Sequence, residues 1–181
     1  MKKYFVNPVI NMEDPLQGIF ANRAIKDELI SNINAFPDQF QATIKVALSD
    51  KQPQAWRATW ILGHCVMKND PRIRDHITAF INALNKRKDG HQREILKILE
   101  KMDLKDDQEG HLFNECMNIW ESIGKSPSVR ITAFRILVKI SKNYPELNHE
   151  IEFLTQDRYT ETLSPGVKHS FEKIWAEDDK L

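Results

Sequence analysis

The sequence predicts an all-α protein, and three observations support this fold class. Seven of the eight prolines stand where a helix could begin, because the fixed backbone angle of proline suits the first helical turn. At four of them, beginning with Asp14-Pro15 and Asp70-Pro71, a capping side chain comes directly before the proline. Apolar residues recur three and four positions apart, and no stretch alternates with the period of two expected of a half-buried strand.

The first four predicted helices each begin next to a proline. They cover residues 15–35, 38–49, 53–68 and 71–85. Short connections separate them, so successive helices are expected to run antiparallel.

Five further helices are predicted in the rest of the chain. They cover residues 90–103, 107–123, 127–143, 146–157 and 165–176. The apolar stripe is clearest in two of them, as Ile95, Leu96, Ile98, Leu99 and Met102, and as Ile131, Phe134, Leu137, Val138 and Ile140. Ser126-Pro127 and Ser164-Pro165 mark the starts of the third and fifth.

We expect one domain over residues 1–181, because no Ser/Gly-rich linker or low-complexity tract divides the chain. Residues 1–14 are predicted to form an irregular N-terminal arm. Residues 177–181 are predicted to form a charged tail that frays.

The composition excludes several classes of protein. The chain has 181 residues, with 26 Lys and Arg against 26 Asp and Glu, and two cysteines 51 positions apart. Zero net charge removes the usual electrostatic argument for general nucleic-acid binding, so nucleic acid is not an expected partner. The cysteine spacing indicates neither a disulfide framework nor a zinc site. With no signal peptide and no apolar run long enough to span a membrane, we expect a cytoplasmic protein without a membrane partner.

The neutral charge is a cancellation between the two halves of the sequence. Residues 1–90 hold 13 basic and nine acidic side chains, whereas residues 91–181 hold 13 and 17. This predicts a basic end near Lys45 and Arg72 and an acidic end near Glu150 and Glu177. Such a molecule could associate head to tail.

An internal repeat is marked by four basic residues at intervals of 36, 37 and 38 positions. They are Arg57, Arg93, Arg130 and Lys168, which we call the register residues. Three positions after them come Trp60, Leu96, Ala133 and Phe171, and six positions after them come Gly63, Leu99, Ile136 and Ile174. Repeated helix pairs stack because one pair alone cannot bury its apolar faces.

This repeat resembles the HEAT repeat. Ser126-Pro-Ser-Val-Arg130 followed by Ala133 and Leu137 is similar to the second helix of that repeat, as is Gln54-Ala-Trp-Arg57 followed by Leu62-Gly63. The resemblance implies a right-handed α-solenoid of about four helix pairs plus one N-terminal helix, covering roughly residues 38–176. It also implies that the second helices line a concave, partner-binding surface.

The closing segment, from Asn118 to Lys168, also resembles a small bacterial family of HEAT-like proteins without an established activity. Some members of that family carry the name adenylosuccinate lyase. No lyase signature is present in this sequence, and we do not transfer the name.

An aromatic and cationic group is the first candidate binding site. Trp56, Trp60 and His64 are spaced i, i+4, i+8 and so share a helix face, with Arg57 beside them. They could bind a peptide or a nucleobase. The alternative is core packing, because this helix is apolar nearly all round.

The register residues Arg57, Arg93, Arg130 and Lys168 are the second candidate. They could form a ladder of positive charge that binds carboxylate or phosphate groups. The alternative is a structural role, in which each side chain covers its own repeat and bridges neighbouring turns.

No catalytic group, metal site or cofactor site is predicted. The six histidines are scattered, and Cys65 and Cys116 fall in apolar helical contexts where a thiol is not activated. There is no phosphate loop, nucleophile elbow or zinc-protease motif.

The leading hypothesis is therefore a non-catalytic protein- or peptide-binding module. One alternative is a nucleic-acid-acting enzyme that resembles the HEAT-like alkylpurine DNA glycosylases, with Trp56, Trp60 and Arg57 as its aromatic and cationic parts. Another is a structural homo-oligomer.

Overall fold

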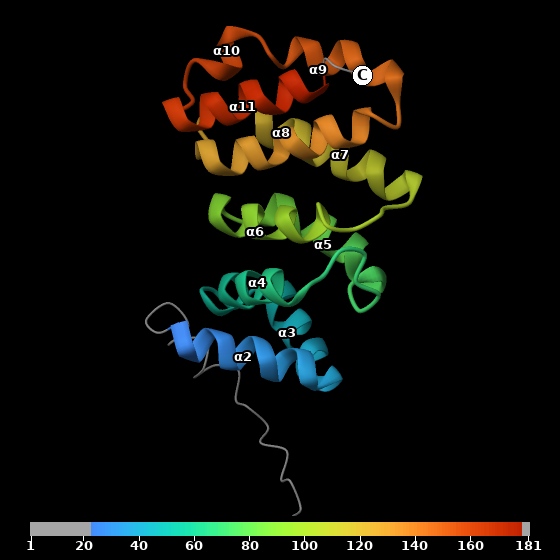
Figure 1. Ribbon diagram of the computed structural model, residues 1–181, viewed down its shortest axis with the longest axis vertical. Helices are drawn as coiled ribbons and strands as arrows, with labels where there is room; N and C mark the ends of the chain where they lie inside the picture. Colours follow the sequence, from blue (N-terminus) through green and yellow to red (C-terminus); the bar gives the residue numbers. More distant parts are fainter. Residues whose placement is uncertain (1–22, 179–181) are drawn as a thin grey trace, which may run out of the picture. The chain divides into compact units, whose positions relative to one another are not determined.

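The computed structural model describes residues 23–178, all of whose regular elements are helices. The predicted all-α class is therefore confirmed over this range (Figure 1). The predicted N-terminal arm, residues 1–14, lies outside the described residues, as do residues 179–181 of the predicted tail. The last helix continues through Asp178, two residues beyond its predicted end.

The chain forms two compact units, Met1–Cys65 and Val66–Leu181, which we call unit 1 and unit 2. In unit 1, α2 (Arg23–Ala35) packs on both α3 (Pro37–Leu48) and α4 (Gln54–Cys65). Phe40, Ile44 and Ile61 form part of its core and are at most 1% exposed. Helix α4 ends at Cys65, three residues before its predicted end.

Unit 2 contains the remaining helices, which follow the predicted order. The α-helices are α5 (Ile77–Ala83), α6 (Asp89–Leu99), α7 (Asp106–Glu121), α8 (Pro127–Ser141), α9 (Asn148–Phe153), α10 (Asp157–Thr160) and α11 (Pro165–Asp178). Three short 3-10 helices, Arg74–His76, Leu84–Lys86 and Pro145–Leu147, flank α5 and precede α9. Helices α6, α7 and α8 agree with their predicted ranges within four residues at each end.

The prediction of one continuous helix over residues 71–85 is wrong. Asp70 accepts hydrogen bonds from the backbone N–H groups of Met67 (3.3 Å) and Arg72 (3.1 Å), which stabilises a tight turn. Backbone bonds of the i to i+3 type then lead from this turn into the 3-10 helix. Only residues Ile77–Ala83 of this range are α-helical.

The predicted helix over residues 146–157 is also divided. Helix α9 ends at Phe153, where the hydroxyl of Thr155 donates to the Glu152 carbonyl at 2.7 Å. Such side-chain bonds compete with continuation of a helix. Gln156 is extended, with ψ 149°, and α10 starts after it as an element that the sequence did not predict.

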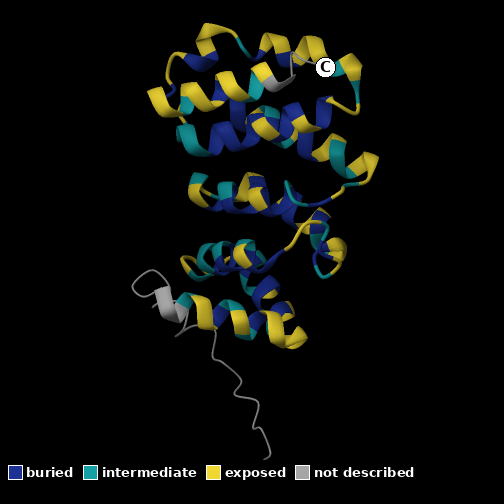
Figure 2. Ribbon diagram, in the orientation of Figure 1, coloured by how far each residue is buried: buried dark blue, intermediate teal, exposed yellow. Residues whose placement is uncertain are grey.

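The helices of unit 2 form stacked pairs. Helix α7 pairs with α8, α5 pairs with α6, and α8 packs against both α6 and α11 (Figure 1). The faces turned toward neighbouring helices are buried, and the outer faces are exposed (Figure 2). The second helices α6, α8 and α11 therefore lie in successive layers.

Hydrogen bonds between the layers of unit 2 link residues about one repeat apart. The Trp120 indole, for example, donates to the Leu154 carbonyl, 34 positions away, at 3.0 Å. Lys101 Nζ donates to the Val66 carbonyl, 35 positions away, at 2.9 Å. These separations match the predicted repeat length, which explains why a 36- to 38-residue period is visible in the sequence.

Asp89 provides one such connection between repeats. Its carboxylate accepts from Lys125 Nζ at 3.0 Å and from the Ser126 N–H at 2.6 Å, joining the start of α6 to the start of α8. Burial raises the pKa of Asp89, but these two donors lower it by more, and the net pKa lies below its ordinary value.

Candidate binding surface

The register residues lie on α4, α6, α8 and α11, the second helices of the four pairs, and their exposure differs. Lys168 is exposed, Arg57 and Arg93 are half-buried, and Arg130 is fully buried. The four residues therefore do not form a uniform ladder of surface charge.

Arg130 lies in the core of unit 2. Its Nε donates to the Trp120 carbonyl at 2.9 Å, and its two terminal nitrogens donate to the Thr162 hydroxyl at 3.0 Å and the Tyr159 carbonyl at 2.5 Å. The guanidinium carbon lies 4.8 Å from the centre of the Trp120 ring. Burial lowers the pKa of Arg130. This side chain joins α8 to the end of α7 and to the α10 segment, which consists of α10 and the two residues after it. Arg130 therefore lies in the core and not on the binding face where it was predicted.

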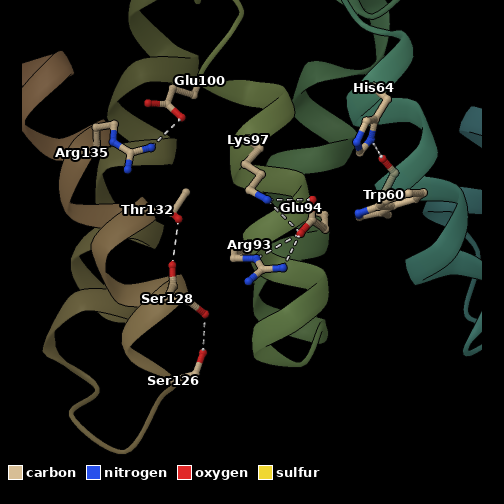
Figure 3. A network of polar contacts seen from close by, with 10 residues as sticks. All are labelled: Trp60, His64, Arg93, Glu94, Lys97, Glu100, Ser126, Ser128, Thr132 and Arg135. Atoms are coloured by element: carbon tan, nitrogen blue, oxygen red, sulfur yellow. Dashed lines mark hydrogen bonds and ion pairs between the residues drawn. The ribbon is translucent and has the colours of Figure 1, made fainter. Parts of the chain in front are cut away.

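Arg93 belongs to a surface network on α6 (Figure 3). Its Nε and a terminal nitrogen donate to Glu94 Oε1 at 3.0 and 2.8 Å, and Lys97 Nζ lies 3.2 Å from the same oxygen. The Glu94 side chain is only 3% exposed, whereas those of Arg93 and Lys97 are 35% and 46% exposed. A buried carboxylate thus holds two cations in place at the surface.

In unit 1, Trp60 and His64 form an accessible aromatic pair on α4 (Figure 3). Their ring centres are 4.4 Å apart at an interplanar angle of 51°. His64 is exposed, and its Nδ1 donates to the Trp60 carbonyl at 2.9 Å, which fixes the orientation of the imidazole. Trp60 is half-buried.

Trp56 and Arg57, like Trp60, are only partly exposed. Both residues are half-buried, and Trp56 Nε1 and Arg57 Nε are themselves buried atoms.

A groove in unit 2 runs along α8 and α11. It has a volume of about 490 Å³ and is lined by cationic residues from both helices and by Glu100 at the end of α6. A terminal nitrogen of Arg135 lies 3.5 Å from Glu100 Oε2 (Figure 3). Lys139 Nζ donates to the Glu100 carbonyl at 2.8 Å. Lys168, also on α11, is not among the lining residues.

The sequence reasoning missed Glu94 and the α8 cations. Arg135 and Lys139 are spaced i, i+4 on a helix whose remaining residues are largely apolar, and this pattern could have indicated a charged outer face. Glu94 gave no such signal, because burial of a carboxylate depends on the helices packed around it.

Within the described part of the chain, no group of three or more His, Cys, Asp or Glu side chains could hold a metal ion. Cys65 and Cys116 are buried, and burial raises the pKa of the Cys116 thiol well above its ordinary value, so this thiol is not activated as a nucleophile. Among residues 23–178, no helix is both long and apolar enough to span a bilayer.

Comparison with known protein families identifies the repeat. Residues 12–177 match the HEAT repeat domain, whereas searches among curated proteins and among solved structures gave no match. The matched region includes all four register residues and most of each unit. The resemblance predicted from the repeat is confirmed, and the chain belongs to the HEAT repeat family.

Proposed function

We propose that this protein is a non-catalytic module that binds a protein or peptide partner through its second helices. The Glu94 network is the observation that carries the proposal. Because Glu94 fixes Arg93 and Lys97 before any ligand arrives, less side-chain entropy is lost when these cations contact a partner. Membership of a repeat family whose stacked helices offer extended surfaces supports the same proposal.

Trp60 and His64 are proposed as a separate contact element in unit 1. A half-buried tryptophan offers apolar area and an indole N–H, which are the properties of residues that dominate protein interfaces. Lys168 is proposed as a further contact because its side chain is exposed. Arg130 is left out because its guanidinium is buried and bonded within unit 2.

The test compares three immobilised forms of the protein in native lysate at low salt: wild type, Arg93→Gln/Lys97→Gln and Lys88→Gln/Lys105→Gln. The third form is a matched control, because Lys88 and Lys105 are exposed residues next to α6 and α7 and carry the same total charge. A stoichiometric partner should be retained by wild type and control and lost by the α6 variant.

Two results would contradict the proposal. One is a partner retained equally by all three forms. The other is measurable turnover on some substrate without any stoichiometric partner, which would favour an enzyme. Filter binding to duplex DNA across about 50 to 200 mM salt examines the nucleic-acid alternative, because phosphate binding produces a steep salt dependence. Sedimentation velocity at two concentrations examines the homo-oligomer.

A further inference from the structure

The groove along α8 and α11 concentrates positive charge in the acidic half of the sequence. The groove is lined by Arg135 and Lys139 from α8, by Lys142 directly after α8 and by Lys173 from α11, and among the described lining residues Glu100 is the one carboxylate. All four cations are exposed residues. Their charges are therefore close together on one surface although residues 91–181 carry a net negative charge.

The groove also has an apolar part. Val138 from α8 and Ile174 from α11 contribute to its lining, and Val138 is only 4% exposed. A ligand made only of charged groups would leave this part unfilled. The lining fits a ligand that places an apolar group between negative charges.

The spacing on α8 fits an extended peptide. Arg135 and Lys139 are four residues apart on one helix face, a rise of roughly 6 Å. In an extended chain, side chains on the same side recur every two residues, roughly 6.6 Å apart. Carboxylates at positions i and i+2 can thus reach Arg135 and Lys139, while the residue between them turns toward α11 and Ile174.

A second groove in unit 2 has the opposite charge. Its volume is about 370 Å³, and it is lined by Asp106, Glu146 and Glu150 together with Phe113 and Tyr144. An acidic ligand is repelled by this second groove and attracted to the α8–α11 groove. The charges of unit 2 therefore direct such a ligand to one groove and away from the other.

We infer that the α8–α11 groove binds an acidic segment of a partner protein in extended form, with the pattern acid-apolar-acid. This inference rests on the proposed binding function and specifies one of its sites. A peptide is favoured over nucleic acid because Val138 and Ile174 line the groove beside the cations, and an apolar side chain between two acidic ones can contact them, whereas a phosphate backbone offers no such group.

The experiment measures fluorescence anisotropy of a labelled Gly-Ser-Glu-Leu-Glu-Leu-Glu-Gly peptide on the full-length chain at low salt. The comparison peptide carries Gln in place of each Glu. Wild type should bind the acidic peptide at least about tenfold more tightly than the Gln peptide. Arg135→Gln/Lys142→Gln should weaken acidic-peptide binding by about tenfold, and Lys88→Gln/Lys105→Gln should change it less than about twofold.

Circular dichroism melting checks that each variant is folded. Because both substituted groove residues are exposed, the melting temperatures of the variants should agree with that of wild type. If Arg135→Gln/Lys142→Gln is unfolded, Lys142→Gln/Lys173→Gln replaces it, and this second variant should weaken binding to a similar extent.

Equal binding of both peptides, or equal loss in the groove and control variants, overturns the inference. So does tighter binding of a single-stranded oligonucleotide to the groove, lost in the groove variant. The inference can also fail while the proposed function stands: a natural partner would then be lost by Arg93→Gln/Lys97→Gln but retained by the groove variant in the presence of excess acidic peptide.

Discussion

Two clusters in this protein each combine a tryptophan with a nitrogen-bearing side chain, and they have opposite environments. In unit 2, Trp120 and Arg130 are both 0% exposed. In unit 1, Trp60 is half-buried and His64 is exposed. Within each pair the side chains are close. The guanidinium carbon of Arg130 lies 4.8 Å from the centre of the Trp120 ring, and the ring centres of His64 and Trp60 are 4.4 Å apart.

The difference between the clusters comes from the neighbours that cover them. Trp120 packs against Phe134 and Phe171, with ring centres 4.6 and 5.7 Å apart, and its indole donates to Leu154. The α10 segment supplies Tyr159 and Thr162 as acceptors for Arg130. The buried polar groups are tolerated because each finds a partner. A tryptophan beside a nitrogen-bearing side chain is thus fully buried in one unit and half-buried in the other.

The largest effect is expected for Trp120→Ala. Removing this ring leaves a cavity between α7, α8 and α11 and abolishes the bond to Leu154, so the free energy of unfolding should fall by about 3–5 kcal/mol. Urea denaturation followed by circular dichroism measures it. A loss below about 1 kcal/mol would mean that Trp120 is not the centre of the unit 2 core.

Arg130→Met is expected to have the next largest effect. The substitution keeps an unbranched side chain but leaves the Trp120 and Tyr159 carbonyls without these donors, and it should reduce the free energy of unfolding by about 2–3 kcal/mol. Arg130→Lys should recover only part of the loss, because an ammonium cannot reproduce the planar fork that reaches three acceptors. Wild-type stability of the Met variant would contradict the structural role of Arg130.

Trp60→Ala should reduce stability less than the two preceding substitutions and should weaken partner binding more. Because only part of the ring is buried, we expect a loss of about 1–2 kcal/mol in the free energy of unfolding. Binding of a partner found in the lysate experiment should be lost or strongly weakened. A stability loss as large as that of Trp120→Ala, with binding retained once the protein is folded, would place Trp60 with the core cluster instead.

The last prediction concerns pH and a site outside both clusters, because neither cluster contains a carboxylate. Acid sensitivity should come instead from Asp70, which is 1% exposed and whose pKa is lowered, chiefly by the hydrogen bonds from the Arg72 side chain. A carboxylate with a lowered pKa in the folded state stabilises the fold above its unfolded pKa. This contribution is lost as the pH falls below about 4.

Asp70→Asn should therefore cost about 1–2 kcal/mol at pH 7 and less at pH 3, as measured by denaturation at both values. Asp75→Asn is the matched control, since Asp75 is exposed on the following 3-10 helix. An equal loss for both variants, or a loss for Asp70→Asn that does not change with pH, would contradict the assignment.

The sequence predicted most of the architecture because helix starts and apolar spacing are local signals. Pro127 with its stripe from Ile131 to Ile140 gave α8 within two residues. The breaks at residues 71–76 and 154–156 could not be predicted from periodicity, since they depend on side-chain bonds made by Asp70 and Thr155. The single domain predicted for residues 1–181 stays a prediction.

By itself, the sequence determined the all-α class, the repeat period and the family, because a stacked repeat places similar residues at fixed intervals along the chain. It could not determine what each register residue does. Arg93 and Arg130 occupy equivalent positions 37 residues apart, yet Arg93 is half-buried and pairs with the buried carboxylate of Glu94, whereas Arg130 is itself fully buried. Tertiary structure decided this, because α10 and its flanking residues cover Arg130 and provide its acceptors, whereas the acceptor for Arg93 is its own sequence neighbour Glu94.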